Sequence, residues 1–213
     1  MARIVVIGGT GYAGGHIVRE AVSRGHEVVA VARKAPEEPV DGATHVQGDI
    51  RDLDGLSDVL TGADAVIDAV SPRGDMADSA VEALRALAGK LTGTSTRLGV
   101  VGGAMGSLSA PGGPRLFDLG VPPEFDNEPK VGVDSLELLE ASDAGLDWFL
   151  VHPPKEFGAW VPGERTGQYR DGGDVVVEDA DGNSFISGAD FAIAVVDEIE
   201  QGRHRRARFT VGY

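Results

Sequence analysis

Cysteine is absent from this 213-residue chain, and aromatic residues make up only 6% of it. The missing thiols exclude disulfides, thiolate metal sites and a cysteine nucleophile, and they favour a reducing compartment. Basic residues are also scarce, since 19 Lys and Arg stand against 34 Asp and Glu and give a formal net charge of −15. Because nucleic acids are bound largely through basic side chains, we expect no nucleic-acid partner.

Long apolar runs are missing as well. No stretch approaches the roughly 20 apolar residues of a membrane-spanning helix, so we expect no membrane partner and a cytoplasmic location. The first residues, MARIVVIGG, pass from a short apolar run straight into glycines, which is typical of a core strand rather than a signal peptide. The five histidines are scattered and form no zinc motif, so no metal site is expected. Length and a 42% hydrophobic content predict one domain over residues 1–213.

The most informative segment is residues 4–15, IVVIGGTGYAGG. Its β-branched apolar run is typical of a strand buried on both faces, and its glycines fit both GxGxxG, from Gly9, and GxxGxxG, from Gly8. In such a turn we expect Gly9 to allow the tight bend, Gly11 the close approach of a phosphate, and Gly14 close packing of the next helix on the strand. A structural glycine turn is the alternative, but the strand-turn-helix context favours a pyrophosphate site at the helix N-terminus.

Strands and helices alternate along most of the chain. The predicted strands cover residues 4–7, 27–32, 44–47, 65–70, 98–101, 148–151 and 208–211, and the predicted helices cover residues 16–24, 53–60, 76–88, 132–144 and 191–200. We also predict a hairpin of residues 175–177 and 184–186, and an N-cap formed by Ser187 with Asp190. This order predicts an α/β fold, a doubly wound parallel sheet of the Rossmann type in a single domain.

The end of the second predicted strand indicates which dinucleotide is preferred. An acidic residue there binds the ribose of NAD, but this chain has Arg33 and Lys34, which favour the 2′-phosphate of NADP(H) over NAD(H). A solvated basic pair is the alternative. Asp49 could bind the adenine edge while Ile50 packs on the ring, or it could simply cap a loop. Ser71 follows the fourth strand, where the chain passes the expected ligand crevice.

Two side chains are candidates for catalysis. Ser107 follows the fifth strand and His152 ends the sixth, so both are predicted at the carboxyl ends of the sheet, where they could orient an acceptor or relay a proton. A turn cap and a buried core histidine are the respective alternatives. The chain has no YxxxK pair, which argues against alcohol–ketone chemistry. A Pro- and Gly-rich stretch at about residues 105–130 is the candidate substrate loop.

The segments IGGTGYAGGHIV, GDIRD, VVGGAMGSL and LDWFLVHPP, with the closing stretch from Ser184, resemble the atypical short-chain dehydrogenases known as NADH-flavin reductases. That group is similar to biliverdin reductase B and NmrA-like proteins. The resemblance implies that Ser107 lies near the nicotinamide. It also implies a set of dinucleotide contacts: Gly8, Thr10, Gly11, Tyr12, Ala13, Arg33, Asp49, Ile50, Ala69 and Val70. Met105 departs from the group pattern GGAGSL, and Phe125 stands where a tyrosine is common.

Together these features predict an NADPH-dependent reductase that transfers hydride to a planar conjugated small-molecule acceptor, such as a flavin or quinone, and that is a monomer or homodimer. An NmrA-like redox sensor without turnover is one alternative. An NAD-dependent epimerase or dehydratase is another, although such enzymes generally rely on the missing Tyr-Lys pair.

Overall fold

The computed structural model describes residues 1–121 and 127–213, and these form an α/β fold around one sheet. The eight strands lie in the order β3-β2-β1-β4-β5-β6-β8-β7. All neighbouring strands are parallel except β7, which runs antiparallel to β8. The strands are β1 (Arg3–Ile7), β2 (Glu27–Ala32), β3 (Ala43–Gln47), β4 (Ala65–Asp68), β5 (Arg97–Val101), β6 (Trp148–His152), β7 (Arg170–Asp171) and β8 (Ala207–Gly212).

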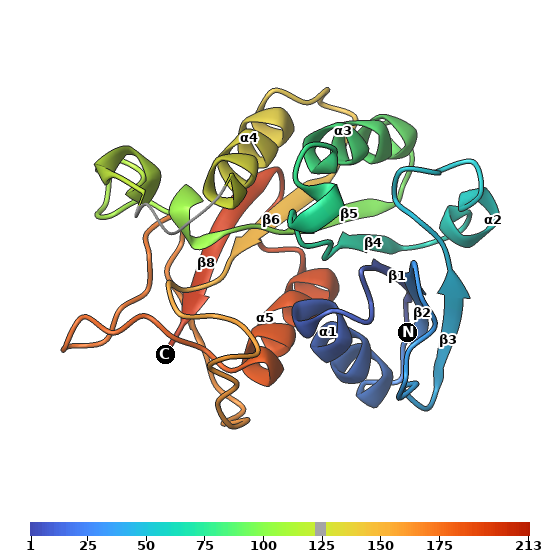
Figure 1. Cartoon of the computed structure of the whole chain (residues 1–213), viewed down its shortest axis with the longest axis horizontal. Coiled ribbons are helices and arrows are strands. Elements are labelled where there is room, and N and C mark those ends of the chain that lie inside the picture. Colours follow the sequence, from blue (N-terminus) through green and yellow to red (C-terminus); the bar gives the residue numbers. More distant parts are fainter. Residues whose placement is uncertain (122–126) are drawn as a thin grey trace.

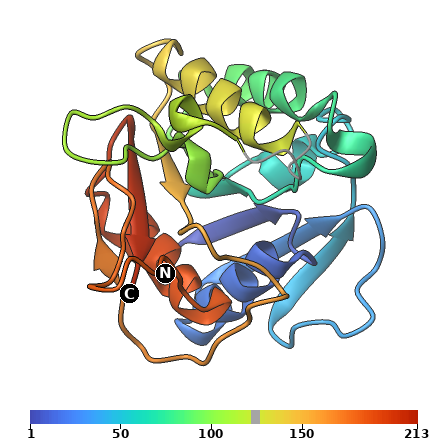
Figure 2. The ribbon, with the colours of Figure 1, turned by 60° about the vertical axis from the view of Figure 1, so that its left-hand side comes forward.

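Helices cover both faces of this sheet (Figures 1 and 2). Helices α1 and α5 pack together on one face, and α3 and α4 lie on the other. The helices are α1 (Tyr12–Ser23), the short α2 (Ser57–Leu60), α3 (Ala80–Leu91), α4 (Glu128–Glu140) and α5 (Gly188–Gln201), with 3₁₀ turns η1 (Gly74–Met76), η2 (Ala104–Gly106) and η3 (Leu116–Leu119). Within the described ranges, no helix is long and apolar enough to cross a membrane.

The core consists of two apolar layers, one on each side of the sheet. Alternate residues of β1 divide between them, with Val5 and Ile7 on the α3/α4 side and Ile4 and Val6 on the α1/α5 side. The predicted doubly wound parallel sheet is therefore confirmed. Strand order reverses between β1 and β4, and the carboxyl ends of strands at such a reversal form the ligand crevice of these folds.

Some predicted elements were wrong in their boundaries. Helix α4 begins at Glu128, four residues before the predicted start, because Pro129 occupies the first turn, where proline is favoured. Helix α1 begins at Tyr12 rather than His16, because Gly14 and Gly15 continue the helix. The N-cap was predicted correctly, since the Ser187 hydroxyl accepts a hydrogen bond from the Asp190 N–H at 3.1 Å.

The predicted hairpin of residues 175–177 and 184–186 was wrong, although its turn forms around Asp179. Its two segments make isolated bridges to other parts of the chain, Val175 to Leu108 and Phe185 to Glu156. The segment that does pair antiparallel, β7, was missed, because two exposed polar residues carry no alternating pattern.

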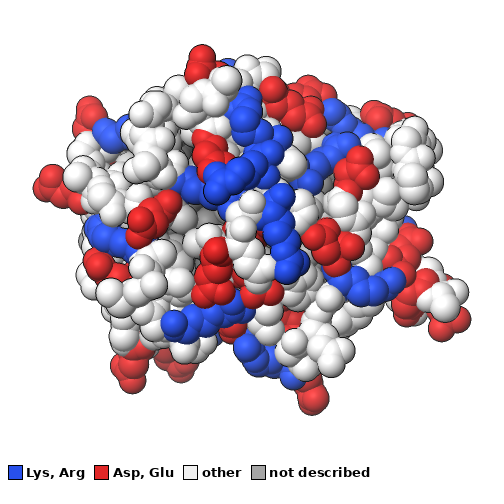
Figure 3. Space-filling view, turned by 180° about the vertical axis from the view of Figure 1, so that it is seen from behind, with Lys and Arg blue, Asp and Glu red and all other residues white. Residues whose placement is uncertain are grey.

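The most buried ion pair joins the start of β5 to the end of α5. Arg97 and Glu198 are 6% and 3% exposed, and their side chains meet at 2.5 Å. Arg97 also donates to the backbone oxygens of Glu198 and His204, and its guanidinium lies over the Phe149 ring. In each other described ion pair at least one side chain is partly exposed, and Figure 3 shows acidic and basic side chains interleaved across the rear face. Removing one partner of a pair this buried strongly lowers stability, because the other charge stays buried without compensation.

We predict that Arg97→Met lowers the free energy of unfolding by about 3 kcal/mol, because Glu198 stays buried without its main cationic partner. Arg85→Met is the matched control, because Arg85 pairs with Glu82 at 3.2 Å and both side chains are exposed. The expected loss in free energy of unfolding is below about 0.5 kcal/mol. Urea denaturation of both variants measures the difference. Equal losses would contradict the assigned role of the Arg97–Glu198 pair.

Candidate active site

A large cavity opens at the carboxyl ends of the strands, where the strand order reverses. Its volume of about 950 Å³ lies at the upper end of the range typical of cofactor and small-molecule sites. Its walls come from the glycine turn, the ends of β2 and β3, and the segments 69–73, 101–105, 116–120 and 153–160. The predicted substrate loop thus contributes Met105, Leu116 and Leu119 to the wall. Phe125 lies outside the described residues.

The glycine turn brings helix α1 close against β1 and β2. The N–H groups of Gly8 and Gly9 both donate to the Val31 oxygen, at 2.9 and 3.1 Å. Gly8 has φ +84°, so it provides the backbone conformation that we expected of Gly9. A Cβ at Gly9 would instead lie 2.9 Å from the Ala30 side chain. A Cβ at Gly14 would collide with the Gly8 oxygen, so its predicted role in close helix packing agrees with the geometry.

The first turn of α1 presents unused donors to the cavity. Gly11 is the N-cap, and Gly11, Tyr12 and Ala13 all line the cavity wall. Among the described residues, no acceptor takes the N–H of Tyr12 or Ala13, and no acidic side chain lies in this turn. A Cβ at Gly11 would have only the Gly8 oxygen within 4 Å, at 3.2 Å. This open, donor-rich helix end fits a pyrophosphate, because the helix dipole adds partial positive charge.

Tyr12 is held in place by contacts to two distant segments. Its hydroxyl accepts from the Gly188 N–H at 3.0 Å and donates to the Pro162 oxygen at 3.3 Å. Its ring meets the Phe157 ring edge-on, with centroids 5.3 Å apart. Partial burial raises the pKa of this hydroxyl. Tyr12 therefore shapes the cavity wall as expected, and its hydroxyl is already engaged.

A cluster of two arginines and two carboxylates lies at the end of β2. Arg33 lines the cavity and pairs with Asp75. Arg51 contacts the same Asp75 at 3.2 Å and Asp49 at 2.5 Å. Lys34 is exposed and is not among the described residues that line the cavity. Arg51 is not a lining residue either, but it supplies the second guanidinium of the cluster through Asp75 and lies inside the GDIRD segment already used for the family resemblance.

The remaining predicted contacts come together along the same wall. Gly8, Thr10, Asp49, Ile50, Ala69, Val70 and Ser71 all line the cavity. The Asp49 carboxylate accepts from the backbone and side chain of Arg51, and these bonds lower the pKa of Asp49. Ile50 is buried, which suits the predicted apolar contact.

The two catalytic candidates lie behind the cavity wall. Ser107 and His152 are both 0% exposed, and neither is among the described lining residues. The His152 Nδ1 lies 2.7 Å from the Gly103 oxygen, and burial lowers the pKa of its imidazole to about 3. Turn η2 covers His152, and a Cβ at Gly106 would collide with the imidazole. The expectation that both side chains face a nicotinamide does not agree with this placement, because neither side chain is exposed to the cavity.

A sequence model described as NAD(P)H-binding matches residues 8–201. The chain belongs to this NAD(P)H-binding family. The match includes the glycine turn, both arginines of the basic cluster and helix α5, so the family assignment and the cavity geometry rest on the same residues.

Relatives of similar length support this assignment. The "Uncharacterized protein YwnB" of Bacillus subtilis is 38% identical over 216 residues, covering 98% of this chain and 97% of that protein. A Streptococcus pneumoniae structure named "a putative NADH-flavin reductase" has a TM-score of 0.90 and 35% identity, covering 100% of this chain and 99% of that one. A Bacteroides thetaiotaomicron structure named "putative epimerase" has a TM-score of 0.83 and 35% identity, covering 100% and 97%. The predicted resemblance to atypical short-chain dehydrogenases is confirmed.

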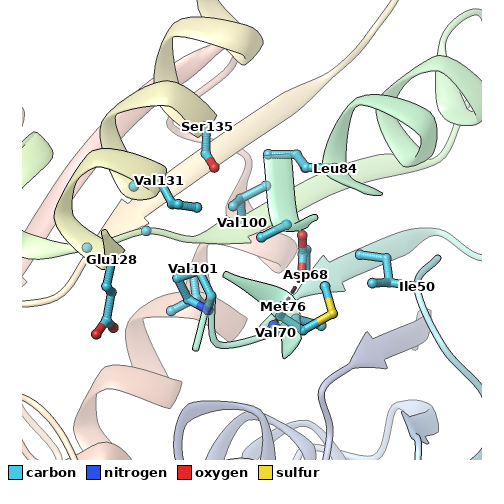
Figure 4. Close-up of a pocket in the computed structure, with 15 residues that line it drawn as sticks. Ile50, Asp68, Val70, Met76, Leu84, Val100, Val101, Glu128, Val131 and Ser135 are labelled. Atoms are coloured by element: carbon cyan, nitrogen blue, oxygen red, sulfur yellow. Dashed lines mark hydrogen bonds between the residues drawn. The ribbon is translucent and has the colours of Figure 1, made fainter. Parts of the chain in front are cut away.

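A smaller side cavity of about 60 Å³ lies between β4, β5, α3 and α4 and shares part of its wall with the large one (Figure 4). Asp68, 9% exposed, faces it among apolar side chains such as Leu84 and Val100. Its Oδ1 accepts from the Val70 N–H at 3.1 Å, which is the dashed line in Figure 4. Burial raises the pKa of this carboxyl group from 3.8 to about 6. Asp68 therefore takes up a proton more readily in the folded chain than in the unfolded one.

We predict that Asp68→Asn changes how stability depends on pH. Because the folded pKa of Asp68 is raised, its favourable contribution is complete below pH 3.8 and is lost as pH rises through about 6. Relative to wild type, the free energy of unfolding of the variant should rise by about 2.5 kcal/mol between pH 4 and pH 7.5. Urea denaturation across this range measures the change. A difference between the two proteins that stays constant with pH would contradict the burial argument.

Proposed function

We propose that this protein is an NADPH-dependent oxidoreductase that reduces a planar conjugated acceptor such as a flavin or a quinone. The observation that carries the proposal is the open first turn of α1, whose Tyr12 and Ala13 N–H groups border a cavity of about 950 Å³. The NAD(P)H-binding family assignment supports the use of a nicotinamide dinucleotide, and the name of the Streptococcus pneumoniae structure supports a flavin as the acceptor.

The chain's own residues would bind and orient the dinucleotide. The N–H groups of the first turn bind the pyrophosphate, Ile50 and Asp49 contact the adenine, and Arg33 with Arg51 binds the 2′-phosphate. The two guanidinium groups are balanced by Asp75 and Asp49, so binding would depend on the planar donor geometry of guanidinium, which matches phosphate well. Bound NADPH would supply hydride, and the protein would supply position and electrostatics.

Among the described residues, the side chains best suited to donate a proton are enclosed or engaged, which favours a conjugated acceptor. Ser107 and His152 are enclosed, and the Tyr12 hydroxyl is engaged by two backbone groups. Lys155, which lines the cavity, pairs with Glu178. A flavin or quinone can take a proton from water after it is reduced, so it needs no dedicated acid at the site. An epimerase generally needs one, and although Tyr12 and Lys155 both line the described cavity, each is engaged by other groups and no described hydrogen bond joins them.

Turnover distinguishes this proposal from a dinucleotide sensor. We expect NADPH oxidation, followed at 340 nm, to accelerate when flavin mononucleotide or a soluble quinone is added to the protein. Tight binding of NADPH and NADP⁺ with no acceptor-dependent turnover would contradict the enzyme and support an NmrA-like sensor.

We predict that Gly11→Val weakens NADPH binding by about 100-fold or more, because a branched side chain at the N-cap obstructs hydrogen bonds to a charged group worth about 1.5–3 kcal/mol each. Gly11 has φ −73°, so the variant can keep the fold. Gly89→Val is the matched control, because a Cβ at Gly89 meets no atom within 4 Å. Calorimetric titration measures both, and wild-type affinity in Gly11→Val would refute the pyrophosphate site.

We predict that Arg33→Gln and Arg51→Gln each weaken NADPH binding by about 10-fold and leave NADH binding nearly unchanged, because only NADPH carries the 2′-phosphate. Lys34→Gln, on the exposed neighbour, should alter neither. Titrations of the three variants with both dinucleotides test the assignment. Equal losses for NADPH and NADH would show that the two arginines do not recognise the 2′-phosphate.

A further inference from the structure

Exposed apolar side chains gather at the mouth of the large cavity. Apart from Met1, the large hydrophobic side chains that are strongly exposed in the described ranges are Leu119 and Trp160, at 64% and 62%. Both line the cavity, although they come from segments 41 positions apart in the chain. An exposed tryptophan is costly in water, and its position at a ligand cavity points to an apolar ligand.

The Trp160 ring is oriented despite its exposure. A Cβ added to Gly158 would collide with the indole, so the ring lies directly against the Gly158 backbone. The Val161 N–H donates to the Gly158 oxygen at 3.0 Å and closes this turn. Further along, Arg165 pairs with Glu20 of α1 at 2.5 Å. The loop therefore holds the indole in place before any ligand arrives, which reduces the entropy lost on binding.

Arg73 lies beside the indole and keeps donors free. Its guanidinium carbon is 5.7 Å from the Trp160 ring centroid, which leaves a loose cation–π contact rather than a closely stacked one. Its Nε donates to Glu128 at 2.6 Å. Its two terminal nitrogens have no acceptor among the described residues, and its side chain is 57% exposed. These exposed donors are therefore available to an anionic group in the cavity.

We propose that Trp160 and Leu119 form the acceptor platform, on which a planar aromatic acceptor stacks, and that Arg73 binds an anionic substituent of that acceptor. The proposal rests on the proposed function and names its substrate class, namely planar aromatic compounds with a phosphate or carboxylate group. The acceptor ring stacks on the Trp160 face that the Arg73 guanidinium now lies over. The terminal nitrogens of Arg73 then bind the anion, while its Nε stays bonded to Glu128. Flavin mononucleotide should therefore bind more tightly than riboflavin, which has the same ring system without the phosphate.

The two tryptophans make binding directly observable. Trp148 is 1% exposed in β6, whereas Trp160 lines the cavity, so quenching by a stacked flavin reports mainly on Trp160. Titration of the protein with flavin mononucleotide, alone and with saturating NADP⁺, should quench the emission. Trp160→Leu, which keeps an apolar side chain, should abolish this quenching and weaken flavin binding about 10-fold by equilibrium dialysis, and Trp160→Phe should restore most of the affinity.

The charge preference is tested with Arg73→Gln. This variant should bind riboflavin as wild type does and should lose the preference for flavin mononucleotide, since only the phosphate interacts with Arg73. Unchanged flavin mononucleotide affinity in Trp160→Leu, an unchanged phosphate preference in Arg73→Gln, or no flavin binding with or without NADP⁺ would overturn the proposal. A change of oligomeric state in Trp160→Leu by size exclusion would likewise contradict it, because it would show that the patch is a contact between copies.

The experiment separates this proposal from the proposed function. Flavin quenching that depends on Trp160 without NADPH oxidation would support the platform and contradict the reductase. Acceptor turnover with an unchanged KM in Trp160→Leu would support the reductase and contradict the platform. If both hold, Trp160→Leu raises the acceptor KM about 10-fold and leaves the NADPH dissociation constant unchanged.

Discussion

The close contact between the first turn of α1 and the β1 turn is the constraint on which the site depends. Gly8 bends the chain at a positive φ, Gly9 fits against Ala30 of β2, and Gly14 brings the helix onto the Gly8 oxygen. A side chain at Gly14 would force the helix away from the turn, and one at Gly8 would collide with the Ala69 backbone after β4. Because the helix lies so close, its unused N–H groups reach the cavity at the point where the strand order reverses.

The sequence predicts the centre of the sheet well because β1, β2, β4, β5 and β6 are mostly buried on both faces and therefore read as apolar runs. The Ser187 cap is equally local, since it needs only a hydroxyl three residues before an N–H. The start of α4 was missed because Pro129 was read as part of a loop, although proline is common in a first helical turn. The hairpin was wrong because Val175 and Phe185 find partners far away in the sequence.

In the candidate site, too, contacts between residues far apart in the sequence were not predicted. Their positions after strands place Ser107 and His152 at the carboxyl edge of the sheet, as predicted. The direction of their side chains depends on how η2 folds over the imidazole, which no local pattern indicates. The glycine turn, Arg33, Asp49 and Val70 are brought together as expected, because they follow four neighbouring strands. Arg51, Leu119 and Trp160 gain their importance from tertiary contacts that no local pattern records.

The charges around the cavity explain how an acidic chain can accept an anionic cofactor. Arg33 and Arg51 share Asp75, Arg73 pairs with Glu128, and Lys155 pairs with Glu178. Each of these basic side chains is held by a carboxylate, which also balances its charge. A phosphate that arrives must compete with the carboxylates, so recognition depends on the geometry of the guanidinium groups more than on overall charge.

A crystal structure of the protein with NADPH would show where the dinucleotide binds. We expect pyrophosphate oxygens within hydrogen-bond distance of the Tyr12 and Ala13 N–H groups, and the 2′-phosphate between Arg33 and Arg51. A dinucleotide bound elsewhere, or a first turn of α1 that makes no phosphate contact, would contradict this expectation.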